Sequence, residues 1–212
     1  MPLNFQKRSE DFQLGIWRMD ESFDELLRML VLNEPDRNVL NTFKSEYRKL
    51  EWLTTRVLLK EFLASSETGS IVYESNGKPR LVNSSLSISI SHTKNFVALL
   101  IAKSASAGID LETIQPRIEK IAKKFVTKQE EIFIDENKKQ NYHHVIWGTK
   151  EVLFKIYGKG ELNFLEHLHA EKFILKDTGE LTGRITKDDF KKEYRIFYEK
   201  LDNLMLVYAL DN

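Results

Sequence analysis

Two short segments of the sequence carry residue types suited to holding a metal-bound phosphate. In the first, Gly108–Glu112, apolar residues alternate with carboxylates, so an extended backbone would direct Asp110 and Glu112 to one face and the apolar side chains into the core. The α-carbons of the two acids would lie roughly 6 to 7 Å apart, close enough for both carboxylates to reach one ion. Mg²⁺ is the natural candidate, because it takes oxygen ligands and completes its octahedron with water and substrate phosphate.

The second segment, Trp147–Lys155, is predicted to be helical. Trp147, Glu151 and Lys155 recur at four-residue intervals and would share one face, beside an apolar stripe. An ordinary Glu-to-Lys pair on a solvated helix has the same spacing and contributes only about 0.2–0.5 kcal/mol. Each segment alone favours such a structural interpretation, whereas their occurrence together favours phosphoryl-group chemistry.

Further short motifs stand in order around these two segments: Asn76–Pro79, Ser89–Thr93, Lys124–Glu130 and Gly158–Gly160. Taken together, the chain resembles the 4′-phosphopantetheinyl transferases, specifically the larger, monomeric, surfactin-synthetase-activating type, over most of its length. The strongest matches are to the family patterns G-[IV]-D-x-E and W-x-x-K-E-x-x-x-K. Glu51 and Trp52 depart from the better-known members, some of which have Arg-Thr there.

The resemblance implies an α+β fold built from two similar α+β subdomains related by a pseudo-twofold, with coenzyme A between them. We expect an N-terminal subdomain over residues 1–105 and a C-terminal subdomain over residues 106–212 that carries the metal and catalytic motifs. The small-residue stretch Ser104–Gly108 is the best candidate hinge. Strands and helices also segregate within each half, which independently favours the α+β class.

The activity implied by the resemblance is transfer of the 4′-phosphopantetheine arm of coenzyme A to a serine hydroxyl of an apo acyl or peptidyl carrier protein, with release of adenosine 3′,5′-bisphosphate. Asp110, Glu112 and Glu151 would hold Mg²⁺, or Mn²⁺ in its place. Glu151 would also accept the serine proton, and its division between base and metal ligand stays open. Lys150 and Lys155 would stabilise the developing phosphate charge.

For coenzyme A itself, the motif matches imply Lys78, Ser91 and His92, with Asp110 and Lys155 at the diphosphate. His92 would contact the 3′-phosphate, although a hydrogen-bonded histidine at a strand end is the structural alternative.

Three arginines are weaker candidates for the same ligand. Arg80 is suggested only by its proximity to Lys78. Arg48 and Arg56 lie eight residues apart on a predicted helix and could face the same phosphates, but a solvated helix face explains them equally well.

The carrier protein is expected to dock on the residues after Gly160 and on the region from Phe125 to Phe133, as in the family. Phe125, Ile132 and Phe133 are individually better explained as core residues. Since carrier proteins are acidic, four lysines could guide docking by charge complementarity: Lys120, Lys123, Lys124 and Lys128.

Composition sets outer limits on the function. The 212 residues are 42% hydrophobic and balance 32 Lys plus Arg against 32 Asp plus Glu, so no global basicity indicates a nucleic-acid partner. The absence of cysteine excludes disulfides and thiol chemistry. The N-terminal residues do not have the pattern of a secretory signal. The longest apolar run, Phe96–Ala102, is too short to span a membrane. We expect a cytoplasmic protein that binds neither nucleic acid nor membrane, and the family resemblance implies a monomer.

Local patterns predict the remaining elements. Helices are expected over residues 23–30, 43–63, 117–125 and 138–157, with a further helix opened by Thr127 and Glu130 in capping-box spacing. Strands are expected at residues 71–73, 86–90, 96–102, 173–175, 180–185, 194–198 and 205–210, and turns at 76–77, 177–179 and 202–203.

Two functions from other classes fit the same residues. A Mg²⁺-dependent phosphoester hydrolase would use the same carboxylates, but it would turn over coenzyme A without a protein acceptor. A non-catalytic module that binds coenzyme A or a carrier protein would keep the scaffold, but the intact acids and Lys155 argue against it.

Overall fold

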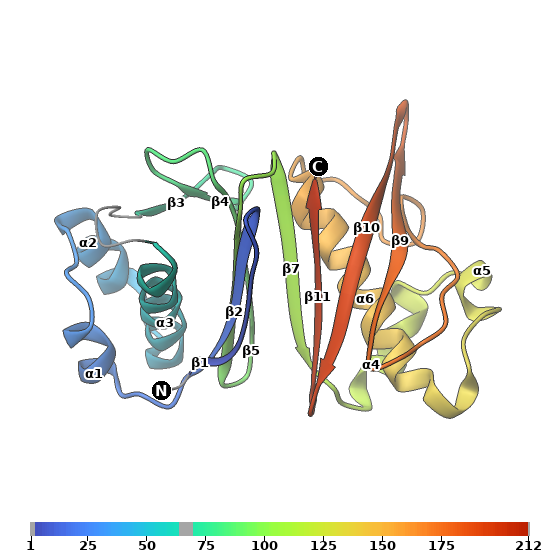
Figure 1. Ribbon diagram of the computed structural model, residues 1–212, viewed down its shortest axis with the longest axis horizontal. Helices are drawn as coiled ribbons and strands as arrows, with labels where there is room; N and C mark the ends of the chain where they lie inside the picture. The colour runs from blue at the N-terminus through green and yellow to red at the C-terminus, as the bar shows by residue number, and fades with distance from the viewer. Residues whose placement is uncertain (1–2, 64–69, 212) are drawn as a thin grey trace.

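The strands of this protein form two large antiparallel sheets that lie face to face. The computed structural model describes residues 3–63 and 70–211. Within these residues a four-stranded sheet and a five-stranded sheet stand side by side, and α1 to α3 lie beyond the first (Figure 1). The long helix α6 packs on β7 and β11 of the second sheet.

The N-terminal half combines the four-stranded sheet with its helices. The strand order is β1-β2-β6-β5, with bounds Leu3–Arg8, Phe12–Arg18, Phe96–Ala102 and Ser87–Thr93. Its helices are α1 (Phe23–Arg28), α2 (Glu34–Thr42) and α3 (Glu46–Phe62). A small hairpin of β3 (Ile71–Tyr73) and β4 (Pro79–Leu81) turns at Gly77, whose positive φ of 83° suits a residue without a Cβ.

The C-terminal half combines the five-stranded sheet with a second set of helices. The order is β7-β11-β10-β9-β8, with bounds Ser106–Thr113, Leu204–Asp211, Phe190–Leu201, Thr178–Lys187 and Leu168–Ala170. Helices α4 (Arg117–Ile121), α5 (Lys128–Glu131) and α6 (Lys139–Tyr157) are joined by the 3₁₀ turns Ala122–Lys124 and Glu136–Lys138. Thr127 and Glu130 cap α5 reciprocally, as the sequence predicts.

Three apolar clusters hold the layers together. One joins α3 to the outer face of the first sheet through residues such as Leu53 and Leu99. A second fills the space between the sheets and includes Ile109 and Leu111 of β7. The third joins α6 to the second sheet. The alternation predicted for β7 is therefore confirmed, because its apolar side chains enter the core between the sheets while Asp110 and Glu112 face the other way.

Side-chain hydroxyls from β5 connect the two halves. Ser89 Oγ accepts a hydrogen bond from Ile109 N at 3.0 Å, and Ser91 Oγ accepts one from Leu111 N at 3.1 Å. Thr93 Oγ1 continues the series by accepting from Thr113 N at 3.2 Å. We call Ser89, Ser91 and Thr93 the hydroxyl ladder. It satisfies backbone donors on the edge strand β7 that β11 does not reach.

The α+β class is confirmed, and so are the main predicted helices and the strands at Ile71–Tyr73 and Phe96–Ala102. Three local predictions are wrong. Residues 173–175, which the structure describes, form no strand. Residues 178–179 belong to β9 rather than to a turn. The expected hinge reaches only to residue 105, since Ser106–Gly108 begin β7. The sequence does not predict strands β1, β2, β4 and β8 or helix α2.

We propose residues 103–105, between β6 and β7, as the boundary of the two subdomains, because the strands on either side belong to different sheets. Among the described residues, no helix combines the length and the apolar character needed to cross a membrane.

Gly108→Ala tests the close approach of α6 to β7. A Cβ at Gly108 would lie 2.6 Å from the backbone oxygen of Val152, so the helix would have to move. We expect a loss of about 1–3 kcal/mol in the free energy of unfolding, measured by urea denaturation. The control is Gly160→Asn, where φ is +70° and a Cβ would meet nothing within 4 Å; Asn tolerates this backbone conformation. Equal stability of both variants would contradict the close packing.

Candidate active site

Asp110 is the point at which three elements meet. Its carboxylate lies on β7 and is buried, with 5% of the residue exposed. Lys155 of α6 donates to Asp110 Oδ1 at 3.0 Å and to the Ile109 carbonyl at 2.7 Å. Ser91 of β5 donates to the same Oδ1 at 3.2 Å. The lysine and the hydroxyl therefore fix one oxygen of Asp110 from opposite halves of the protein.

The other two predicted acids lie close enough to Asp110 to feel its charge. Burial raises the pKa of Glu112 to about 7, and the charge of Asp110 adds to this effect. Burial likewise raises the pKa of Glu151 to about 7, again with a contribution from Asp110, while Lys155 acts in the opposite direction. Trp147 Nε1 donates to Glu112 Oε1 at 3.2 Å and thereby orients that carboxylate. The three acids thus form one electrostatically coupled group.

This group fits a divalent cation. Asp110 Oδ2 is buried and finds no hydrogen-bond partner among the described residues, although an unpaired buried carboxylate oxygen is costly. Oxygen donors are the ligands that Mg²⁺ and Mn²⁺ prefer. No three His, Cys, Asp or Glu side chains in residues 3–63 and 70–211 are already arranged as a metal-ligand set, so Glu112 and Glu151 would have to turn toward Asp110 on binding.

A cavity of about 270 Å³ opens beside Lys155 and is lined from both halves of the protein. The N-terminal half contributes three groups suited to phosphate: Arg48, Lys78 and His92. The C-terminal half contributes Lys155, the exposed ring of Phe154 and the glycines that follow α6. Of the predicted coenzyme A residues, the structure therefore brings these four basic side chains to one cavity, with Ser91 and Asp110 next to Lys155.

At the α3 side of the cavity, Arg48 links two neighbours. Its Nη1 lies 3.1 Å from His92 Nε2 and 2.8 Å from Glu51 Oε2. Since a guanidinium only donates, Nε2 accepts and His92 is neutral in this arrangement. Burial lowers the pKa of His92, and the charge of Glu51 acts against that lowering. Glu51, which departs from the family pattern, thus neutralises part of the positive charge here.

Lys78 reaches from the β3–β4 hairpin to the C-terminal end of α6. Its Nζ donates to Ser106 Oγ at 2.9 Å and lies 3.5 Å from the Ile156 carbonyl. Asn76 Nδ2 donates to the Gly158 carbonyl at 2.5 Å. Burial lowers the pKa of Lys78, although Glu74 and Asp211 oppose this. The hairpin therefore fixes the end of the helix that carries Glu151 and Lys155.

Two predicted arginines lie outside the cavity. Arg56 is buried: its guanidinium carbon lies 3.2 Å from the centre of the Trp52 ring, and its Nη2 lies 3.5 Å from Asp36 Oδ1. Arg80 is exposed, with Nη1 3.5 Å from the Leu81 carbonyl. Neither arginine lines the cavity, so the structure gives no support for a role of either in binding coenzyme A.

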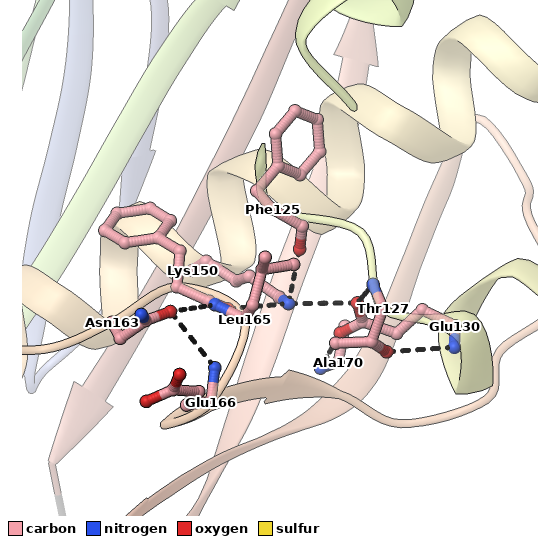
Figure 2. Close-up of polar contacts among 9 residues, drawn as sticks. Phe125, Thr127, Glu130, Lys150, Asn163, Leu165, Glu166 and Ala170 are labelled. Carbon is pink, nitrogen blue, oxygen red and sulfur yellow. Dashed lines mark hydrogen bonds and ion pairs between the residues drawn. The ribbon is translucent and has the colours of Figure 1, made fainter. Parts of the chain in front are cut away.

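Lys150 is the principal correction to the predicted site. Its side chain is fully buried and points away from Asp110 into a network drawn in Figure 2. Its ammonium donates to Glu130 Oε2 at 2.9 Å and to the carbonyls of Phe125 and Phe164 at 2.5 and 3.0 Å. Burial lowers the pKa of Lys150, and the charge of Glu130 opposes this lowering. All three of its donors are engaged by the protein, so Lys150 has none for a phosphate.

The same network secures the loops around α6. Glu130 Oε1 accepts from Ala170 N at 3.0 Å, and Oε2 accepts from Thr127 N at 2.8 Å. Asn163 Oδ1 accepts from Leu165 N at 2.8 Å, next to the Phe164 carbonyl that Lys150 reaches (Figure 2). The Lys150–Glu130 pair thus connects α5, β8 and the loop after Gly160 to α6.

Sequence reasoning missed the hydroxyl ladder and Asn76. The alternation of Ser89, Ser91 and Thr93 with apolar residues carried the signal, since side chains two apart on a strand share a face. Their partners on β7 are twenty residues distant, so the contacts themselves could not be read from the sequence.

Lys150→Met tests the structural role of the buried pair. The variant leaves the Glu130 carboxylate buried without its partner, and we expect the free energy of unfolding to fall by about 3–5 kcal/mol. Adding Glu130→Gln should recover much of the loss, because the amide still accepts from Ala170 N without carrying a charge. Lys120→Met, at an exposed site, is the control in thermal and urea unfolding. Unchanged stability with lost activity would instead favour a role toward phosphate.

Comparison with known proteins agrees with this geometry. Residues 106–209 match the sequence model of the 4′-phosphopantetheinyl transferase superfamily, and this stretch contains all three acids and Lys155. Two curated relatives, the 4′-phosphopantetheinyl transferases AcpT of Salmonella typhi and Salmonella typhimurium, are each 37% identical over 71 residues, 33% of this chain and 36% of the relative. The chain thus aligns with about a third of the length of these relatives. Through residues 106–209, the chain belongs to the 4′-phosphopantetheinyl transferase superfamily.

Proposed function

We propose that this protein transfers the 4′-phosphopantetheine arm of coenzyme A to a serine of an apo acyl or peptidyl carrier protein, which makes it a holo-acyl-carrier-protein synthase. The observation that carries the proposal is the Asp110–Lys155 pair at the edge of a cavity lined by both halves. The family match over the C-terminal half and the names of the AcpT relatives support the same activity.

The cavity side chains suit a ligand with several phosphates. Lys155 lies next to the carboxylates and would hold the diphosphate of coenzyme A against them. Arg48 and His92 lie farther toward α3 and would receive the remaining phosphate. Lys78 is held near the end of α6 and adds positive charge between the two halves.

Asp110, Glu112 and Glu151 would hold Mg²⁺, with Mn²⁺ as a substitute. When bound, the ion would supply a Lewis acid that polarises the diphosphate. Lys155 keeps Asp110 in place by its bond to Oδ1, and the second oxygen receives no hydrogen bond from residues 3–63 or 70–211.

Glu151 would accept the proton of the carrier protein's serine. It lies on α6 one turn before Lys155 and is partly buried beside Asp110. In the reaction the serine oxygen forms a bond to the phosphorus that carries the pantetheine arm, and the bridging P–O bond breaks. The electron pair of that bond leaves on adenosine 3′,5′-bisphosphate, and the serine proton passes to Glu151 directly or through water.

The carrier protein would dock beside α4 and α5. Ile132 is 85% exposed directly after α5, whereas Phe125 is fully buried and Phe133 packs against the core. The expectation that all three are core residues is therefore wrong for Ile132 alone. Four exposed lysines lie on α4, on the 3₁₀ turn that follows it and on α5: Lys120, Lys123, Lys124 and Lys128. An exposed apolar side chain among lysines is complementary to an acidic partner with an apolar contact. A monomeric state, which the family resemblance implies, and a cytoplasmic location, which the sequence suggests, remain parts of the proposal.

Intact-protein mass spectrometry tests the transfer. An apo carrier protein incubated with this protein, coenzyme A and Mg²⁺ should gain the mass of one phosphopantetheine arm. We expect Asp110→Ala and Glu151→Gln to slow the gain by about 10²–10⁴-fold, the usual contribution of a general base or charge-stabilising group. Glu193→Gln, exposed on β10, is the matched control and should retain full activity.

Other outcomes of this assay separate the rival functions. Cleavage of coenzyme A without a carrier would favour a hydrolase. Coenzyme A binding with no mass gain across several carriers would favour a non-catalytic binding module.

Lys123→Glu combined with Lys124→Glu tests the docking surface. We expect KM for the carrier protein to rise about tenfold or more with kcat little changed, because like charges oppose docking rather than chemistry. The double variant Lys191→Glu/Lys200→Glu on β10 reverses the same number of exposed charges elsewhere. Salt should slow the wild-type reaction more than that of the docking variant. Equal KM for the two double variants would place the carrier on another surface.

A further inference from the structure

The Ser91 hydroxyl makes a contact that the rest of the hydroxyl ladder lacks. All three ladder oxygens accept a backbone N–H from β7. Only Ser91, among them, also contacts a carboxylate, by donating its proton to Asp110 Oδ1 at 3.2 Å. Ser91 is 7% exposed and Asp110 5%, so this bond is shielded from water.

The hydrogen-bonding capacity of Ser91 excludes a second strong donation. A hydroxyl has one proton and two acceptor lone pairs. The proton is used on Asp110, and one lone pair is used by Leu111 N. Ser91 therefore has no donor left for a phosphate oxygen of coenzyme A, in contrast to the role that the motif match implies.

Both donors to Asp110 reach the same oxygen. Ser91 and Lys155 converge on Oδ1 from β5 and α6, while Oδ2 finds no partner among the described residues. A Cβ at Gly148 would lie 3.6 Å from Oδ2, in van der Waals contact with it, so α6 places a residue without a side chain next to this oxygen. Two donors on one oxygen fix the rotation of a carboxylate and determine the direction in which its second oxygen points.

We propose that Ser91 is a positioning residue that sets the rotation of Asp110 so that Oδ2 is presented to the divalent cation. This inference rests on the proposed function, because it assigns that cation to Asp110. It also gives the contact between the two halves a role at the site: β5 of the N-terminal half orients a carboxylate on β7 of the C-terminal half. Hydrogen bonds to metal-binding carboxylates typically change metal affinity about 10–100-fold when removed.

Ser89→Ala is the matched control for Ser91→Ala. Each substitution removes one ladder hydroxyl and leaves one β7 amide without its acceptor, but only the second removes a bond to Asp110. We expect similar decreases in melting temperature. In calorimetric titration with Mn²⁺ alone, we expect Ser91→Ala to bind about 10–100-fold more weakly than wild type and Ser89→Ala to stay close to wild type. Ser91→Thr, which keeps the hydroxyl, should restore most of the Mn²⁺ affinity.

Coenzyme A binding without metal separates positioning from direct contact. We expect Ser91→Ala to bind coenzyme A in EDTA as tightly as the wild-type protein does. Weaker coenzyme A binding by Ser91→Ala than by wild type, or equal Mn²⁺ affinity in the two alanine variants, would overturn the inference. If Ser91→Ala does not fold, Ser91→Cys offers a weaker donor of similar shape for the same comparison.

The carrier assay keeps the two proposals apart. If the wild-type protein modifies a carrier but the alanine variants bind Mn²⁺ equally, the positioning role fails and the transferase survives. If no carrier is modified but Mn²⁺ affinity falls only in Ser91→Ala, the transferase fails and the positioning role survives. A wild-type protein that modifies a carrier but binds no Mn²⁺ overturns the positioning role.

Discussion

The contact between the two halves, and with it the position of Asp110, depends on how the backbone N–H groups of the edge strand β7 find acceptors. One side of β7 pairs with β11, and its other side faces the N-terminal half. A buried strand edge with unpaired N–H groups is costly and prone to wrong pairing. Hydroxyls of β5 accept three of these donors, so the two halves meet in one register. Because Asp110 lies between Ile109 and Leu111 on this strand, the register that satisfies the backbone also sets the position of the central carboxylate.

The rest of the site follows from the packing of α6 on the face of the second sheet. Gly108 and Gly148 let α6 approach the sheet, since a Cβ at either position would lie within 2.6 Å of a neighbouring atom. This approach brings Lys155 to Asp110 and keeps Glu151 beside the other acids. The buried Lys150–Glu130 pair then attaches the surrounding loops to the same helix (Figure 2). Adjacent residues of one motif, Lys150 and Glu151, therefore serve a structural network and the candidate site respectively.

The sequence predicts elements well where one segment carries the whole signal. The α6 helix, the capping box at Thr127 and the alternation in β7 all follow from local spacing. The spacing of Arg48 and Arg56 does not give them a common environment, because eight residues on a helix rotate a side chain by about 80°, and Arg56 is buried against Trp52. Lys150 could not be judged because its acceptors lie at residues 125, 130 and 164. Residues 173–175 alternate in burial as a strand does, but their backbone pairs with no neighbouring strand within the described chain.

A crystal structure of the protein with Mn²⁺ and coenzyme A would test most directly whether the meeting of the two halves builds the site. The anomalous signal of Mn²⁺ locates the ion independently of the protein atoms. We predict Mn²⁺ against Asp110 Oδ2, with Ser91 and Lys155 still on Oδ1 and the diphosphate in the cavity beside Lys155. Mn²⁺ bound away from Asp110, or a coenzyme A molecule outside the cavity, would contradict the account.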